Sequence, residues 1–400
     1  MANVSSSNGL EKRPKLRFPG FDEPYRSTQL GDIASLVNRT DPKSNAPIMM
    51  LSAGNGFIMQ SEKYSRDNAG QSLKKYILLK QGELAYNHGA SKAKQFGCCY
   101  ELTEPEARIP YVYHCFKINN HEYTPYIAMA LNNAKMDKQL KRLVSSSVRM
   151  DGLLNISFED YMSVTLHLPP FNEQKRIADF LQKIDVRIAA QEKLLASLKK
   201  YKRGLLMHYF SDDKTKQWTL YSISQIGKVI TGSTPPTNDR SNYDGDLMFC
   251  SPGDVGEEKY ISSTEKRVSP KGFGLGRPIP PNSIIVTCIG LIGKLGIATT
   301  DMITNQQINS LVVSEGFDHE FIYYAFENFF PEYRSKVSMQ TLPILSKSEF
   351  EKLIIKVPVL DVQLKISSHL AAMDRRIEHT QKELNVLFKQ RRGIIQQLFI

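Results

Sequence analysis

The feature that most constrains this chain is an internal repeat with a fixed offset. The segment LPPFNEQKRIADFLQKIDVRI at 168–188 returns 189 residues later as VPVLDVQLKISSHLAAMDRRI at 357–377. Identical residues occupy equivalent positions in the two copies: Pro169 and Pro358, Gln174 and Gln363, Ile177 and Ile366, Leu181 and Leu370, Asp185 and Asp374, Arg187 and Arg376, Ile188 and Ile377. At the same offset ISFEDYMSVTLHLP (156–169) parallels LSKSEFEKLIIKVP (345–358), which predicts a helical turn followed by a strand in each half. A long period that occurs only twice indicates duplication rather than a solenoid, with each half a globular region followed by a long helix.

Each of the two repeated segments has the apolar spacing of a heptad helix. The seam residues are Ile177, Leu181, Ile184, Ile188, Leu195 and Leu198 in the first helix, and Ile366, Leu370, Met373, Ile377, Leu384 and Leu387 in the second. Polar residues occupy the remaining core steps, Gln191 and Lys202 in the first helix and Thr380 and Arg391 in the second. Such a seam requires a partner helix, and the pattern predicts that the partner is the other copy. If the two copies pack antiparallel, a pseudo-two-fold axis relates the two globular regions. The alternative is that each helix packs only on its own globular region.

Composition narrows the class of protein. A chain of 400 residues predicts two or three domains. Its net charge of +11 suits a polyanion such as nucleic acid, although a basic surface can also serve only solubility. The five cysteines form no CxxC pair, and neither a signal peptide nor an apolar run of the ~20 residues needed to span a membrane is present. These features predict a cytoplasmic protein without a membrane segment.

Six segments, in this order along the chain, carry a resemblance to a known family: KLRFPGF (15–21), LGDI (30–33), PPFNEQKRIADFL (169–181), TGSTPP (231–236), TNQQINSLVV (304–313) and RRGIIQQLFI (391–400). Together with the duplicated helices, they make the chain resemble the specificity (S) subunit of a type I restriction–modification enzyme. The resemblance implies an α+β fold, with two mixed α/β target recognition domains separated by two long helices that form an antiparallel coiled coil with a pseudo-two-fold internal repeat. The domain boundaries that it implies are 1–167 for the first recognition domain, 168–212 for the central conserved helix, 213–356 for the second recognition domain and 357–400 for the C-terminal conserved helix.

The resemblance also implies a function and a set of partners. Each domain would recognise one half of a split, asymmetric site in double-stranded DNA, and the helices would set the spacer between the halves. Two modification (methyltransferase) subunits would dock on the helices, and restriction (motor-nuclease) subunits would join them. S-adenosylmethionine, ATP and Mg²⁺ would then belong to these partners, and this chain would be non-catalytic. The alternative is a structural or regulatory coiled-coil protein that binds DNA or protein outside restriction–modification.

The motifs that hint at catalysis are incomplete. The stretch Leu168-Pro-Pro-Phe resembles an adenine methyltransferase tetrapeptide, but that motif begins with a polar residue that binds the target amino group, which Leu168 cannot do. The segment GLIGKL (290–295) lacks the spacing and the Ser/Thr of a phosphate-binding loop. The histidines show no metal-ligand spacing, so no metal site is expected.

Recognition of bases requires amide, hydroxyl or basic side chains that reach the groove edges, while loop amides and lysines can contact phosphate. In the first recognition domain the candidates for DNA contact are Lys63, Arg66, Tyr86, Asn87, His88, Ser91, Lys92, Lys94 and Arg149. In the second they are Thr231, Ser233, Thr234, Asn238, Arg240, Lys294 and Gln340. Asn305-Gln306 is interpreted as a structural turn in preference to a base contact.

Overall fold

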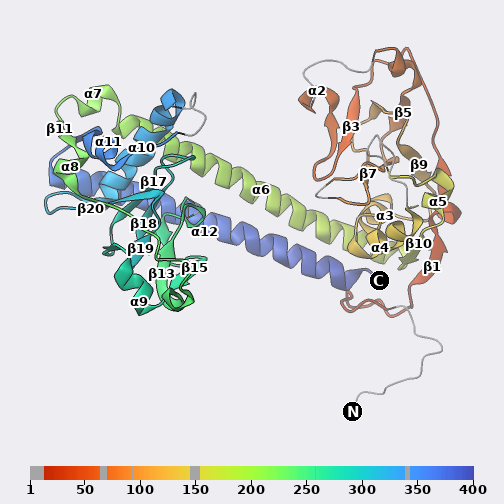
Figure 1. The fold of residues 1–400 in the computed structure, drawn as a ribbon. Helices are drawn as coiled ribbons and strands as arrows, with labels where there is room; N and C mark the ends of the chain where they lie inside the picture. Colours follow the sequence, from red (N-terminus) through yellow and green to blue (C-terminus); the bar gives the residue numbers. More distant parts are fainter. Residues whose placement is uncertain (1–12, 64–69, 92–93, 145–153, 257, 338–342) are drawn as a thin grey trace. The chain divides into compact units, whose positions relative to one another are not determined.

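The structure is a computed structural model that describes residues 13–63, 70–91, 94–144, 154–256, 258–337 and 343–400. The chain divides into two compact units, residues 1–190 with 383–400 and residues 191–382. Two long helices, α6 (Phe171–Tyr209) and α12 (Leu360–Leu398), each contribute to both units, and the rest of each unit is a globular α/β domain (Figure 1). We call these the first and second domains.

The first domain is built around an antiparallel four-stranded sheet of order β2-β9-β6-β7, accompanied by the strand pairs β1–β10, β3–β4 and β5–β8. Its strands are β1 Arg26–Gln29, β2 Ala34–Leu36, β3 Met49–Ser52, β4 Gly56–Met59, β5 Ile77–Lys80, β6 Leu84–Asn87, β7 Cys98–Glu101, β8 Glu106–Ile109, β9 His114–Ile118 and β10 Thr165–Leu168. Its helices are α1 Leu30–Ile33, α2 Gln60–Lys63, the 3₁₀ helix η1 Gly70–Lys75, α3 Thr124–Ala130, α4 Ala134–Leu143 and α5 Phe158–Met162.

The second domain contains a five-stranded sheet of order β12-β20-β17-β18-β14, a four-stranded sheet of order β15-β13-β19-β16 and the pair β11–β21. Its strands are β11 Thr219–Ser222, β12 Gly227–Thr231, β13 Tyr243–Cys250, β14 Tyr260–Ile261, β15 Lys266–Val268, β16 Pro278–Ile279, β17 Ile284–Thr287, β18 Leu295–Ala298, β19 Met302–Thr304, β20 Ile308–Val313 and β21 Ile354–Val357. Its helices are α7 Asp212–Thr215, α8 Ile223–Ile226, η2 Arg240–Asn242, η3 Pro252–Asp254, α9 Pro270–Leu275, α10 His319–Val337 and α11 Lys347–Lys352.

The same joint connects each domain to the long helix that follows it. The strand before each helix pairs antiparallel with the first strand of its domain, β10 with β1 and β21 with β11. A short helix precedes that strand in both halves, and each begins with a capping box, formed by Ser157 in α5 and by Ser346 in α11. The predicted helical turn followed by a strand is therefore confirmed in both copies.

The hydrogen bonds of the repeated glutamine explain why this residue is retained in both copies. Gln174 is 1% exposed, and its Oε1 accepts a hydrogen bond from the backbone N–H of Tyr123 at 2.9 Å. Its Nε2 donates to the carbonyl of Pro169 at 2.9 Å and to the Glu122 carboxylate at 2.6 Å. One side chain thus fastens the start of α3 to the start of α6 within the first unit.

Gln363 does the same in the second unit. Its Oε1 accepts from the backbone N–H of Asp318, just before α10, at 2.9 Å, and its Nε2 donates to the carbonyl of Pro358 at 2.8 Å. A buried amide with both ends satisfied holds the two helix starts in one geometry, because each unmade bond would leave a buried polar group without a partner.

The seam residues of the helices pack in two ways. The first seam positions belong to the core of the helix's own domain: Ile177 and Leu181 join the first domain core, and Ile366 and Leu370 the second. The remaining seam positions are also buried except for Ile184 and Ile377, which are half-buried. Both ways of packing considered for the helices therefore contribute.

Two of the polar steps of the seam, Lys202 and Arg391, form ion pairs between the helices. Arg391 of α12 binds Asp185 of α6 through two guanidinium nitrogens in the first unit. Lys202 of α6 lies 2.7 Å from an oxygen of Asp374 of α12 in the second unit. The two pairs are related by the 189-residue repeat with the roles of the helices exchanged. In the first unit the start of α6 packs against the end of α12, and in the second unit the end of α6 packs against the start of α12. The helices therefore run antiparallel.

Candidate DNA interface

In the second domain, two segments far apart in the sequence lie side by side. The loop 231–236, with sequence TGSTPP, faces the turn 304–307 that joins β19 to β20. The backbone N–H of Ser233 donates to the Thr304 carbonyl at 2.8 Å, and the hydroxyl of Thr234 donates to Gln306 Oε1 at 2.6 Å. A Cβ on Gly232 would lie 2.2 Å from the Asn305 carbonyl oxygen, so only glycine permits this approach.

The polar side chains of this loop divide into structural and exposed ones. The Thr231 hydroxyl donates to Asn309 Oδ1 at 2.6 Å inside the sheet, and the buried Ser233 hydroxyl has no hydrogen-bond partner in the described part of the chain. Thr234 and Gln306 are exposed and can reach a ligand. Asn305 accepts from the Gln307 backbone at 3.0 Å, as the interpretation of this segment as a structural turn requires.

Exposed basic side chains gather beside this loop. Arg240 begins η2 and is exposed, as is the neighbouring Asn238. Lys271 of α9 binds Asp239 at 2.7 Å. This contact, together with hydrogen bonds from Ser241, lowers the pKa of Asp239 to about 2. The guanidinium of Arg277 donates to the Thr231 carbonyl at 3.1 Å, which places an exposed cation next to the loop. Loop, turn and cations together form a polar, basic surface that suits a phosphate backbone and groove edges.

Sequence reasoning missed Lys271 and Arg277. Neither residue belongs to a motif, and only the contacts of α9 with η2 and of Arg277 with Thr231 bring them to the loop. Lys294 lies elsewhere in the domain, at the β17–β18 turn. It is half-buried, and its aliphatic stem lies beside Gly256.

In the first domain, two of the candidates for DNA contact are buried. Tyr86 is 1% exposed, its hydroxyl donates to the Phe96 carbonyl at 2.7 Å, and its ring stacks on Tyr161. His88 is 7% exposed and lies between the carbonyl oxygens of Leu154 and Val112, at 2.8 and 3.0 Å. In this structure both side chains hold the domain together and do not face outward.

His88 also stacks on His114, at 5.0 Å between ring centroids. Burial is the main reason why the pKa of His114 lies below its ordinary value.

The candidates Asn87, Ser91 and Lys94 make polar contacts close to the end of β6. Asn87 Oδ1 accepts from the Gly89 backbone at 2.9 Å. Ser91 and Lys94 close a turn through their backbones, and the Lys94 ammonium donates to the Asn132 carbonyl at 2.8 Å. Lys63 is the last residue of α2. The candidates Arg66, Lys92, Arg149 and Gln340 lie outside the described residues.

Neither a metal centre nor a membrane helix is found within the described ranges. No group of three or more His, Cys, Asp or Glu side chains there could hold a metal ion. No helix there combines the length and hydropathy that crossing a bilayer requires.

Comparison with known proteins gives the family. The model of the type I restriction modification DNA specificity domain matches the chain twice, at residues 25–200 and 215–388. The chain belongs to this family. It contains two copies of the specificity domain, and each copy runs from the first strand of a recognition domain into a long helix, as the internal repeat predicts.

Curated specificity subunits match parts of the chain. The type I restriction enzyme MjaIX specificity subunit of Methanocaldococcus jannaschii is 30% identical over 191 residues, which is 46% of this chain and 44% of that protein. The type I restriction enzyme HindI specificity subunit of Haemophilus influenzae is 31% identical over 108 residues, which is 26% of this chain and 24% of that protein. Each of these two matches thus spans less than half the length of the curated relative.

Solved structures share the fold over nearly the full length. The S subunit of a type I restriction–modification system from M. genitalium is 14% identical, has a TM-score of 0.63, and the match covers 97% of this chain and 99% of that one. A chain from a study of complex assembly and conformational transition of the type I R-M system has a TM-score of 0.56 and 14% identity, covering 96% and 98%. The expected fold, two mixed α/β domains with two long helices, is confirmed. Specificity domains are the non-catalytic part of these systems.

Proposed function

We propose that this chain is the DNA-recognition subunit of a type I restriction–modification complex, in which each domain recognises one half of a split, asymmetric site. The carrying observation is the combination of repeated joints with unlike domains. The β10 and β21 joints and the glutamine contacts are retained in both halves, whereas the sheets that they support differ in strand number and order. Two different recognition surfaces on one repeated scaffold suit two different half-sites.

The helix pair would set the distance between the half-sites. Each helix has 39 residues, or about 58 Å at ~1.5 Å per residue. Insertion of one heptad into both helices should therefore lengthen the spacer, whereas an insertion into one helix should put the two ion pairs out of register. A spacer that is unaltered by the matched insertion would refute this role.

The repeat also places an exposed apolar side chain at the same position of both long helices, which suits two copies of one partner. Phe171, at the first position of α6, is 42% exposed, and its repeat counterpart Leu360, at the first position of α12, is 41% exposed. We assign these positions to the docking of two modification subunits, which restriction subunits then join. S-adenosylmethionine, ATP and Mg²⁺ would act on those partners. The assembled complex would be a site-specific deoxyribonuclease and adenine-N6 DNA methyltransferase of the cytoplasm.

The test is to sequence the methylome of cells that express this chain together with its modification subunit. The expected result is one bipartite adenine-methylated motif, lost when this chain is omitted. The purified chain alone should transfer no methyl groups. Methylation by the chain alone would contradict the non-catalytic role. An unmethylated genome in the presence of an active modification subunit would favour the alternative of a structural or regulatory coiled-coil protein.

A further inference from the structure

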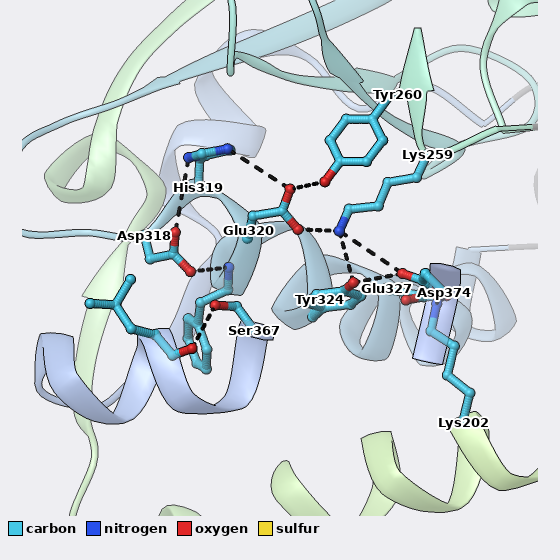
Figure 2. Close-up of polar contacts among 12 residues, drawn as sticks. Lys202, Lys259, Tyr260, Asp318, His319, Glu320, Tyr324, Glu327, Ser367 and Asp374 are labelled. Carbon is cyan, nitrogen blue, oxygen red and sulfur yellow. Dashed lines mark hydrogen bonds and ion pairs between the residues drawn. The ribbon is translucent and has the colours of Figure 1, made fainter. Parts of the chain in front are cut away.

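A network of charged and aromatic side chains, most of them largely shielded from solvent, joins the second domain to both long helices (Figure 2). Its centre is Lys259, which directly precedes β14 and whose side chain is 10% exposed. The Lys259 ammonium donates to the hydroxyl of Tyr324 at 2.7 Å and to the carboxylate of Glu320, both on α10. Tyr260 donates to the other oxygen of Glu320 at 2.5 Å. These contacts fasten the edge strand β14 to α10.

The network continues from α10 to the helix pair. The Tyr324 hydroxyl donates to Asp374 of α12 at 2.6 Å. Asp374 also binds Lys202 of α6, and Lys202 donates to Glu327 of α10 at 2.9 Å. Burial lowers the pKa of Lys202, but the carboxylates of Glu327 and Asp374 outweigh it and raise the pKa, so the ammonium is charged.

The geometry is directional at every step. Lys259 lies 4.2 Å from the ring centroid of Tyr324 and 5.1 Å from those of Tyr323 and Tyr260, so tyrosine rings surround the cation. Apolar packing tolerates sliding, because the hydrophobic effect has no preferred direction. Hydrogen bonds, in contrast, weaken steeply when the donor–acceptor distance or angle departs from its narrow preferred range. The network therefore fixes an angle that the surrounding apolar core leaves adjustable.

No equivalent network is found among the described residues of the first unit. The repeat counterpart of the Lys202–Asp374 pair is the Arg391–Asp185 pair, and among the described residues it has no hydrogen bond to the first domain. The first domain is held at the start of α6, where Arg17 binds the buried Glu173 at 2.8 Å. Position 362, the counterpart of Glu173, is valine. The network is thus a specific property of the second domain and not a remnant of the duplication.

We propose that the Lys259–Glu320–Tyr324–Asp374–Lys202 network is a positioning device that fixes the angle of the second recognition domain on the helix pair, and thereby the spacer length at which the second half-site is accepted. This inference rests on the proposed function and extends it. One base pair moves a half-site by about 3.4 Å and turns it by about 35° around the DNA axis. A domain held at one angle discriminates between spacers that differ by one base pair, whereas a domain free to rotate accepts both.

The experiment uses the assembled complex of this chain with its modification subunits. Methylation rates are measured on duplexes that carry the native half-sites with the native spacer or with a spacer one base pair shorter or longer. Lys259→Met keeps the length and apolar stem of the side chain but removes the charge. It should reduce the preference for the native spacer by about tenfold, mainly by raising the rates on the altered spacers. Lys259→Arg, which keeps the positive charge, should retain most of the preference for the native spacer.

The matched control is Lys382→Met. Lys382 forms an exposed ion pair with Glu378 on α12. Among the described residues it has no hydrogen bond or ion pair to the second domain, and Glu258 makes only the smallest contribution to its raised pKa, so this variant should keep the wild-type preference. Tyr324→Phe removes the hydroxyl that links Lys259 to Asp374 and keeps the ring; it serves if Lys259→Met does not fold.

The outcomes separate the two levels of inference. Equal loss of rate on all spacers in Lys259→Met and Tyr324→Phe indicates a purely structural role and overturns the positioning device, as does an unchanged spacer preference. If the wild-type complex methylates no bipartite site at all, the proposed function fails instead.

Discussion

The repeated glutamines allow a quantitative test of how each domain is attached to its helix. Gln174 makes two hydrogen bonds to backbone groups and a third to the Glu122 carboxylate, whereas Gln363 makes only the two bonds to backbone groups. A neutral buried hydrogen bond contributes about 1 kcal/mol, and one to a charged group about 2 kcal/mol. Gln174→Ala should therefore destabilise the first domain by about 4 kcal/mol, and Gln363→Ala should destabilise the second by about 2 kcal/mol.

The assay is native-state hydrogen exchange, which reports each domain separately and does not require two-state unfolding of the whole chain. The amide of Tyr123 should lose protection in Gln174→Ala, and the amide of Asp318 in Gln363→Ala, each without effect on the other domain. Gln182→Ala, an exposed position of α6, should change neither. Equal costs for the two substitutions, or an unaltered Tyr123 amide in Gln174→Ala, would refute the assignment of the difference to the bond with Glu122.

Three further predictions concern the recognition domains. Gly232→Ala should abolish recognition of the second half-site, because its Cβ would meet a carbonyl oxygen at 2.2 Å, while Gly274→Ala, which meets no atom within 4 Å, should bind DNA normally in a mobility-shift assay. If Arg277 contacts phosphate, Arg277→Ala should weaken DNA binding and lower the slope of log K against log salt by about 1. If Arg240 makes a bidentate base contact, Arg240→Ala should cost about 1–3 kcal/mol of binding free energy and alter the base preference. A variant that binds DNA with the wild-type affinity across a salt titration excludes the role of its residue. Because the folded pKa of His114 is lowered, the folded state binds fewer protons than the unfolded state, so the first domain should be fully stable above pH 6.5 and lose stability as the pH falls below it; His114→Gln should flatten this dependence in denaturant titrations at several pH values.

The sequence predicted the parts of this molecule that the repeat controls. The offset aligned Asp185 with Asp374 and Lys202 with Arg391, and the structure shows that these four residues form two interhelical ion pairs. Their pairing could not be predicted from the heptads alone, because the register between antiparallel helices depends on how the domains close against them.

The candidate DNA surface was harder to predict from the sequence. Tyr86 and His88 look like a polar loop in the sequence, but Tyr86 lies on β6 and His88 directly follows it, and both side chains point into the domain core. A short strand does not reveal which face is buried when polar and aromatic residues alternate. Arg277, in contrast, belongs to no sequence motif, and only its contact with Thr231 makes it part of the candidate interface.

The residues shared by the two halves lie at the joints between domain and helix and along the seam, and not on the candidate DNA surfaces. The glutamine contact, the capped short helix and the strand pair occur twice, and Phe210 and Phe399, also related by the repeat, each pack against an aromatic ring of a different domain. After duplication, mutations at a joint would have separated a domain from its helix, whereas mutations in the sheets would have changed only what that domain binds. This division explains how two unlike recognition domains coexist on a symmetric scaffold. It also explains the asymmetry of the Lys259 network, because a domain that has changed its sheets needs its own contacts to set its angle on helices that have not changed.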